Sequence, residues 1–151
     1  MNNQNQLLEA DFGLGFTYTR SPGPIIGKFL AALQHRELWG IRGSQGDVLF
    51  PPTEYDPRDA AELSEFVHLG QRGRLQSWTW IAEPRDHHLP GKPFAFGMIQ
   101  LDGADVPFLH HVLCDDPAQL KPGLELEVQW ADETVGAITD IAGFAPVAGG
   151  N

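Results

Sequence analysis

Two pairs of adjacent histidines are the residues of this chain best suited to acid–base chemistry. One pair, His87 and His88, lies in a segment bounded by prolines, and the other, His110 and His111, lies in an apolar run. Histidine titrates near neutral pH and can act as a general base. Neighbouring residues of a strand face opposite sides, so His110 and His111 could not bind one ion together. With no nucleophile or carboxylate evidently arranged beside them, a structural role is favoured for this second pair.

Cys114 and two aspartates carry the other reactive side chains. Cys114 is the only cysteine and follows an apolar run, so we expect a small buried residue. The two acidic residues that follow it would oppose formation of the thiolate that a nucleophile needs. Asp102 and Asp105 could act as paired acids, but their Asp-Gly and Ala-Asp context is typical of a hairpin turn. We expect the turn.

Four positions have the spacing of a zinc site without its chemistry. Arg42 and Gln45 are three residues apart, as are Asp56 and Asp59, and ten residues separate the two pairs. Cysteines at these positions would give C-x2-C and C-P-x-C knuckles, a layout that resembles a zinc ribbon. Zinc needs thiolate or imidazole donors, which Arg, Gln and Asp do not supply. The pattern therefore predicts a degenerate, metal-free ribbon.

Asp56 also has a purely structural interpretation, which we favour over any metal role. It could cap a short helix reaching Phe66, with Pro57 at the first position and Asp59 in an acidic first turn. The alternative, a cation bound by oxygen ligands, would require six or more oxygens that are not evident in the sequence.

Composition limits the class of protein. The 151 residues suffice for one domain with a core of its own, or for a small domain with an appendage. A single cysteine excludes an intrachain disulfide and favours the cytoplasm. No apolar run approaches the length of a membrane span, and residues 1–6 lack the features of a signal peptide. The net charge of −10 disfavours binding to nucleic acid.

The first part of the chain predicts a tail and then a helix. We expect a flexible tail over residues 1–20 and a helix-and-ribbon region over residues 21–66. The helix should span residues 21–39, with Ser21 as N-cap, apolar residues at helical spacing and Gly40 as its end. Residues 41–50 suggest a hairpin around a Gly-Ser-Gln-Gly turn.

The remainder, residues 67–148, predicts a mainly β domain. Strands are expected at 67–83 with a break near residues 72–73, and at 93–101, 106–114, 124–132 and 138–146. A short helical turn should fall at residues 115–120. Five strands with a helical insert between the third and fourth describe a five-stranded OB-type barrel.

Several segments, taken in order, resemble the zinc-ribbon/OB-fold proteins associated with acyl-CoA enzymes. The likeness covers about residues 25–147 and depends on the order and spacing of its pieces. Those pieces are a helix ending in Leu38-Trp39-Gly40, the two knuckle positions, Val48-Leu49-Phe50-Pro51-Pro52, Gly73 to Thr79, Pro93 to Asp102, Leu120 to Leu126, and Phe144-Ala145-Pro146.

The absence of all four cysteines is similar to the cysteine-poor branch of that family. Members of this branch partner thiolase-fold aldolases in steroid side-chain breakdown. The resemblance implies a non-catalytic accessory subunit without a cofactor, whose thiolase-fold partner performs a retro-aldol cleavage of an acyl-CoA. Other members serve thiolase-like acyltransferases or synthases, so the partner stays open.

The implied partner and its coenzyme suggest two sets of residues. The helix-and-ribbon region is too small to bury all its aromatic rings, so some should contact a partner, as should the histidine loop. Coenzyme A carries phosphates, which require basic donors. The expected interface residues are Trp39, Phe50, Tyr55, His87 and His88, and the candidates for binding CoA are Arg42, Arg72, Arg74 and Lys92.

Two alternatives belong to other classes of function. A single-stranded nucleic-acid module would explain the aromatic strands, because bases stack on such rings, but the acidic charge opposes it. A stand-alone metal enzyme is disfavoured by the missing cysteines and by the absence of histidines at i,i+2 or i,i+4 spacing.

Overall fold

The computed structural model describes residues 10–148. Expected tail residues 1–9 lie outside this range, and residues 10–20 are extended and exposed. In chain order the elements are α1 (Pro24–Gln34), β1 (Trp39–Arg42), β2 (Val48–Leu49), β3 (Phe66–His68), β4 (Arg72–Ile81), β5 (Phe94–Leu101), β6 (Phe108–Val112), η1 (Pro117–Gln119), β7 (Glu125–Trp130), η2 (Ile138–Asp140) and β8 (Ile141–Pro146).

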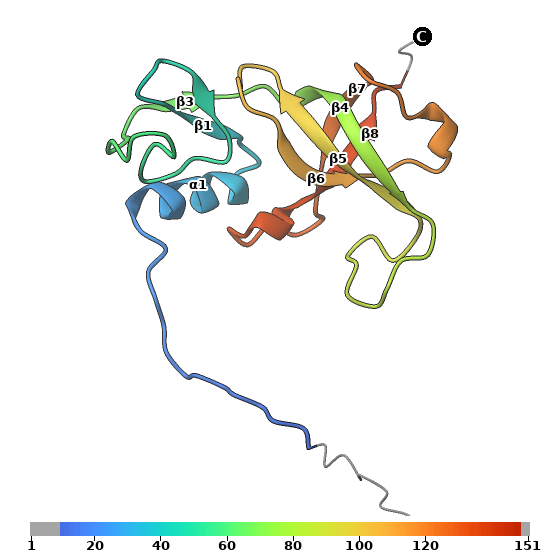
Figure 1. The fold of residues 1–151 in the computed structure, drawn as a ribbon, viewed down its shortest axis with the longest axis horizontal. Coiled ribbons are helices and arrows are strands. Elements are labelled where there is room, and N and C mark those ends of the chain that lie inside the picture. Colours follow the sequence, from blue (N-terminus) through green and yellow to red (C-terminus); the bar gives the residue numbers. More distant parts are fainter. Residues whose placement is uncertain (1–9, 149–151) are drawn as a thin grey trace, which may run out of the picture.

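Strands β4 to β8 form a closed barrel in the order β4-β5-β6-β8-β7, as Figure 1 shows. All neighbouring pairs are antiparallel except β6 and β8, and a bulge between Leu75 and Ser77 bends β4. Apolar residues alternate along β5, so that Ala95, Ile99 and Leu101 are buried in the core. The mainly β, five-stranded barrel with a preceding helix is therefore confirmed.

The helix is shorter at both ends than the predicted span of residues 21–39. Gly23, not Ser21, is the N-cap, and its φ of 93° lies outside the helical region. The carboxylate of Glu54 accepts a hydrogen bond from the free N–H of Ile25 at 3.0 Å, which caps the helix from a distant segment. The helix ends because Arg36 adopts a φ of 60°, which releases Trp39 into β1.

Strands β1, β2 and β3 form a small sheet in the order β2-β1-β3. The predicted hairpin over residues 41–50 is present as the β1–β2 pair. The first part of the strand expected over 67–83 is β3, which pairs with β1 and not with the barrel. The break predicted near residues 72–73 therefore separates two sheets.

The predicted helix from Asp56 to Phe66 is wrong. Residues 57–59 form a turn, and Ala60 has a φ of 59°, which ends any helical path. Asp56 accepts a hydrogen bond from the N–H of Ala60 at 2.9 Å and donates its own N–H to Ala61 at 2.9 Å. The segment doubles back on itself, with an isolated bridge between Tyr55 and Glu62.

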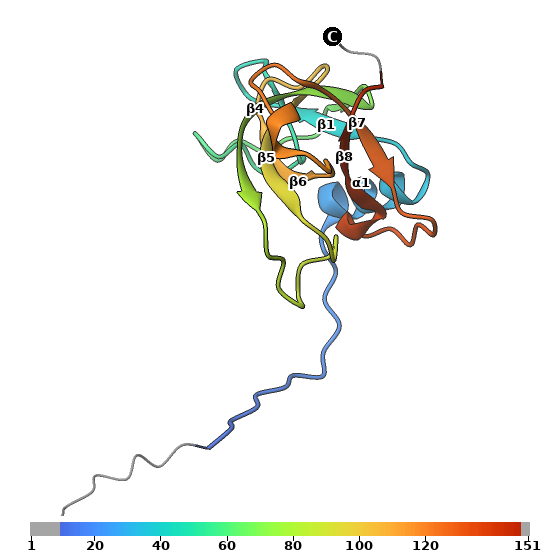
Figure 2. The ribbon, with the colours of Figure 1, turned by 90° about the vertical axis from the view of Figure 1, so that its right-hand side faces the viewer.

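The helix and small sheet share an apolar core with the barrel. Phe29 and Leu33 of α1 belong to the same buried cluster as Phe144 of β8. Figures 1 and 2 show α1 and the small sheet beside the barrel, with residues 10–20 running away from both. None of the helices in the described range is long and apolar enough to cross a membrane.

Candidate partner interface

A buried carboxylate joins the two predicted knuckles. The side chain of Asp56 is fully buried and accepts hydrogen bonds from the N–H and hydroxyl of Ser44, at 3.0 and 3.1 Å. Arg58 donates hydrogen bonds to the same carboxylate from Nε at 2.9 Å and from Nη2 at 2.7 Å. Its Nη2 also donates to the carboxylate of Asp47 at 2.7 Å. We call these four residues (Ser44, Asp47, Asp56 and Arg58) the knuckle cluster.

The electrostatics of the knuckle cluster favour the charged forms. Hydrogen bonds from Arg58 hold the pKa of Asp56 well below its usual range, although burial acts in the opposite direction. The same contact raises the pKa of Arg58. Space is tight, because a Cβ at Gly43 would lie within 3 Å of atoms of Asp47, Arg58 and Asp56.

The four positions with zinc-ribbon spacing are not arranged as a ligand set. The side chain of Gln45 accepts a hydrogen bond from Arg58 at 3.2 Å, and Arg42 turns toward Glu65, 2.8 Å away. Asp59 accepts a hydrogen bond from the N–H of Ala61. Over residues 10–148, no group of three or more His, Cys, Asp or Glu side chains could hold a metal ion.

Each candidate cation for CoA is paired with a carboxylate of this chain. Arg42 contacts Glu65 at 2.8 Å, Arg72 contacts Glu127 at 3.5 Å, Arg74 contacts Glu125 at 2.7 Å and Lys92 contacts Asp115 at 3.0 Å. Only Arg72 and Arg74 come together, on one strand opposite two acids of β7. The structure thus does not gather a phosphate site from these four residues.

The three aromatic residues expected at an interface have different fates. Trp39 is half-buried, with its ring against Phe66 and His68. Tyr55 is 55% exposed and lines an open hollow of about 560 Å³ at the start of α1. Phe50 is only 4% exposed, so the chain itself leaves it little surface for a partner.

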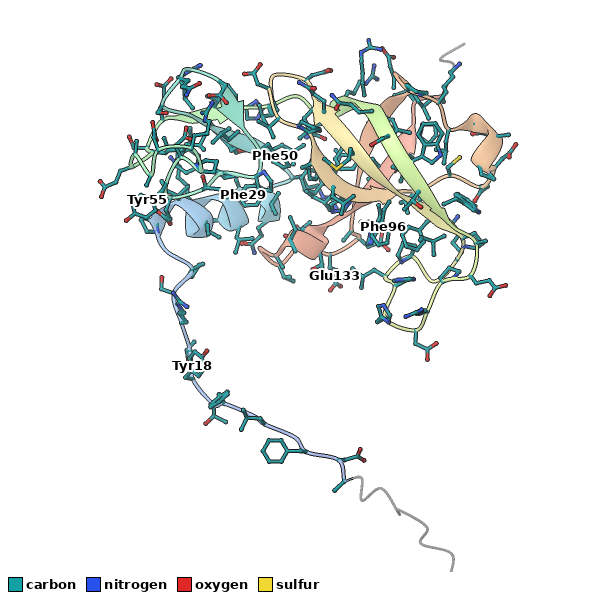
Figure 3. All side chains as sticks on the ribbon, in the orientation of Figure 1. Tyr18, Phe29, Phe50, Tyr55, Phe96 and Glu133 are labelled. Atoms are coloured by element: carbon teal, nitrogen blue, oxygen red, sulfur yellow. The ribbon has the colours of Figure 1, made fainter. Side chains whose placement is uncertain are left out.

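The burial of Phe50 has a clear physical cause. Its ring packs edge-to-face on Phe29 of α1 at 5.7 Å and on Phe108 of β6 at 4.7 Å. Figure 3 shows Phe29 and Phe50 close together near the helix and the small sheet. Phe50 therefore links the helix-and-ribbon region to the barrel.

The two histidine pairs belong to one network of mostly edge-to-face ring contacts. His87 is exposed, while His88 packs on Phe94 and Phe96 with centroids 5.4 and 6.0 Å apart. His111 contacts the same two phenylalanines from β6, at 5.1 and 5.3 Å. The loop that carries His88 is thus packed onto the outer side of the barrel by aromatic contacts.

His110 faces the core, with its ring 5.7 Å from those of Phe108 and Phe144. Burial lowers its pKa to about 4, and it lowers the pKa of His111 as well. The Nδ1 atoms of both residues are buried without a hydrogen-bond partner. A neutral imidazole at pH 7 that packs on the rings of Phe108 and Phe144 is a packing element.

The remaining reactive side chains hold turns. Cys114 is buried, with its Sγ 3.0 Å from the carbonyl oxygen of Asp116. Asp105 accepts a hydrogen bond from the N–H of Val48 at 2.8 Å, which ties the β5–β6 turn to the small sheet. The backbone of Asp102 accepts from the N–H of Gly70 at 3.1 Å. The hairpin-turn interpretation of the two aspartates agrees with these contacts.

The exposed apolar side chains include a group that the predicted interface omitted. Four of them, Phe12, Leu14, Phe16 and Tyr18, alternate along the extended residues before α1. Others lie on the barrel surface, among them Leu89 and Leu109. The period-two spacing of residues 12–18 is visible in the sequence and is the signal that could have found the first group.

Comparison with known proteins adds to this geometry. Residues 66–131 match the family model described as "ChsH2, C-terminal OB-fold domain". The barrel is an OB-fold domain. The match runs from β3 through β7 and leaves α1, β1, β2, η2 and β8 outside it. No curated protein matches the chain.

Two solved structures share the fold with this OB-fold domain and the region before it. A DUF35-family protein of unknown function from Sulfolobus solfataricus is 17% identical over 70% of this chain and 78% of its own, with a TM-score of 0.56. An aldolase described as Ltp2-ChsH2(DUF35) is 16% identical over 79% of this chain and 91% of the matched chain, with a TM-score of 0.58. At such identities the likeness shows the fold alone.

Proposed function

We propose that this chain is a non-catalytic subunit that binds and stabilises a thiolase-fold CoA enzyme. The partner best supported is a retro-aldolase that cleaves the acyl-CoA of a steroid side chain. In that reaction the partner removes the proton of a hydroxyl group and the adjacent carbon–carbon bond breaks. The hydroxyl-bearing carbon becomes a carbonyl, and the carbon next to the thioester takes up a proton.

The observation that carries the proposal is the likeness to a subunit of an aldolase. The OB-fold match is to the ChsH2 C-terminal domain, and one solved structure of similar fold, which covers 79% of this chain, is that of an Ltp2-ChsH2(DUF35) aldolase. The name of that protein describes it, and our proposal extends its role as a subunit to this chain.

The chemistry of the chain supports a non-catalytic role. Of the candidate acids and bases, His110 packs beside phenylalanines and Asp105 holds a turn. Each cationic side chain proposed for CoA forms a salt bridge with a carboxylate of the same chain. We therefore assign both the catalytic groups and most of the coenzyme contacts to the partner.

The region around the hollow is our proposed contact surface on the folded body. Tyr55 lines it, and Arg20, Glu54 and Glu62 supply polar groups around it. Exposed tyrosine beside polar residues is a usual composition for the core and rim of an interface. The loop of His87 and His88, where Leu89 is 70% exposed, is a second candidate surface.

Binding of single-stranded nucleic acid has less support. Exposed Trp78 on β4 could stack a base, but a groove that follows phosphates needs unpaired cations. Of the ten lysines and arginines of the chain, five form salt bridges with its own carboxylates, and the net charge is −10. We infer that the OB-fold domain serves protein binding.

Co-expression with a candidate thiolase-fold aldolase subunit tests the proposal. The expected result is a stable hetero-oligomer by light scattering, with retro-aldol turnover of a hydroxylated steroid side-chain CoA thioester by the complex and none by this chain alone. Turnover by this chain without a partner would contradict the proposal, as would the absence of any complex. A complex that instead transfers acyl groups would assign the partner to the acyltransferase or synthase class.

A further inference from the structure

Residues 12–18 form an extended segment with an unpartnered apolar side. Phe12, Leu14, Phe16 and Tyr18 occupy every second position and are 87, 69, 72 and 74% exposed. The positions between them hold glycine or threonine. This period of two is the pattern of a strand with one apolar face and one small or polar face. We call residues 12–18 the N-terminal segment.

The geometry of the N-terminal segment agrees with that pattern. The rings of Phe16 and Tyr18 lie 6.3 Å apart at an interplanar angle of 63°, as expected for side chains on the same side of an extended chain. Nothing lies within 4 Å of a Cβ placed on Gly13 or Gly15, so the opposite side is bare. Residues 12–19 carry no charge, and Asp11 and Arg20 flank them. The segment therefore suits an apolar, uncharged groove.

The folded body of this chain does not cover the N-terminal segment. Figures 1 and 2 show it running away from the small sheet and the barrel, and Figure 3 shows Tyr18 well away from them. Within residues 10–148, no backbone hydrogen bond joins the segment to another part of the chain. Four large apolar side chains in water are unfavourable, so a binding partner for them is expected.

The sheet edges of this chain are too short to be that partner. The barrel is closed, so it offers no complete edge strand. The edges of the small sheet are β2, with two residues, and β3, with three. The seven residues of the segment span roughly 20 Å when extended. A second copy of the chain offers the same short edges, which favours a different protein as the occupant.

We propose that the N-terminal segment is a docking strand, which adds to an exposed sheet edge of the partner protein and places its four apolar side chains in an adjoining groove. Main-chain hydrogen bonds would supply the pairing, and alternate side chains would supply specificity. This inference rests on the proposed function for the existence of a partner subunit, and it assigns to that partner a free edge of at least seven residues.

The test uses the full chain and the purified thiolase-fold subunit. One variant combines Phe12→Ser, Leu14→Ser, Phe16→Ser and Tyr18→Ser, and a matched control combines Thr17→Ser and Thr19→Ser on the other side. We expect the fourfold variant, which carries all four serine substitutions, to bind the partner roughly 100 times more weakly or worse. The control should bind as the unmodified chain does. Residue-resolved hydrogen exchange should show protection of alternate amides of residues 12–18 in the complex only.

The possible results separate this inference from the proposed function. If the unmodified chain binds and the fourfold variant binds equally well, the docking strand is wrong while the accessory role stands. Protection of no amide in the segment would also overturn it. If the unmodified chain forms no complex, both proposals fall. Light scattering could instead show that the unmodified chain is a homodimer and that the variant with four serines is a monomer. In that case the segment binds a second copy of this chain, and the assignment to a different protein is wrong.

Discussion

The carboxylate of Asp56 and the guanidinium of Arg58 are joined by two parallel hydrogen bonds, at 2.9 and 2.7 Å, although only one residue separates them. The Asp56 side chain is fully buried and the Arg58 side chain is 37% exposed. This pair occupies the junction of the two knuckles, where a metal ion would hold a zinc ribbon together. We infer that the knuckle cluster holds these two segments together.

Removal of Arg58 should destabilise the protein more than removal of a surface arginine. Arg58→Ala leaves the buried Asp56 carboxylate with only the contacts from Ser44 and the backbone. We expect the melting temperature to fall by roughly 5–10 °C. Arg42→Ala, which breaks the exposed pair with Glu65, is the matched control and should change it by less than roughly 2 °C. Equal shifts for the two variants, measured by calorimetry, would contradict a structural role for the cluster.

The pKa of Asp56 predicts a loss of stability in acid. Because the folded state lowers this pKa, the unfolded chain binds the proton more readily. The contribution is therefore complete above the unfolded pKa, near 4, and is lost as the pH falls through the lower folded value. Denaturant titrations should show this acid loss in the unmodified protein and less of it in Arg58→Ala. If the unfolding free energy of Arg58→Ala depended on pH as steeply as that of the unmodified protein, the coupling between Asp56 and Arg58 would be refuted.

Half-buried His110 predicts a second pH dependence at higher pH. Its folded pKa of about 4 lies below its unfolded value, so the unfolded chain takes up the proton first. The free energy of unfolding should therefore rise between pH 4 and about 6.5, by up to roughly 3 kcal/mol from this residue. His110→Leu should flatten the rise, whereas the control His35→Gln, at an exposed position, should keep it. A rise of the same size in His110→Leu would assign it to other groups.

Phe50 and Tyr55 should separate stability from binding. Phe50→Ala removes a ring held between Phe29 and Phe108 and should cost about 3–5 kcal/mol of unfolding free energy. Tyr55→Ser, at an exposed position, should leave that free energy nearly unchanged and weaken the partner complex. The measurements are denaturant titration and titration with the partner subunit. If Tyr55→Ser bound the partner with unchanged affinity, the hollow that Tyr55 lines would not be part of the interface.

The ribbon hypothesis makes a prediction about zinc. Arg42, Gln45 and Asp56 cannot complete a thiolate or imidazole site with Asp59, so the purified chain should hold no stoichiometric zinc by elemental analysis. A variant with cysteine at all four positions should bind about one ion, and its cobalt complex should show the absorption of a tetrahedral thiolate site. Stoichiometric zinc in the unmodified chain would contradict the first expectation. If the cysteine variant folded but bound no metal, the four positions would not have the spatial arrangement of zinc-ribbon ligands.

The sequence alone predicted the barrel because its signals are local. Alternation along residues 94–101 and turns such as Asp102-Gly103 recur along the second half of the chain, and these patterns depend only on neighbouring residues. The first half mixes short elements whose ends depend on distant groups. The N-cap contact of α1, for example, comes from Glu54, which is 29 residues away from Ile25.

Tertiary structure decided the fate of individual side chains. Asp56 has the local features of a helix cap, but Ser44, 12 residues earlier, and Arg58 bind its carboxylate within a tight turn. Phe50 is of a residue type that is common at interfaces, but Phe29 of α1 and Phe108 of β6 pack against it and bury it. Alternation and turn chemistry are properties of adjacent residues and can be read along the chain. Burial and charge pairing are set by which segments meet in space, and only the folded chain fixes those.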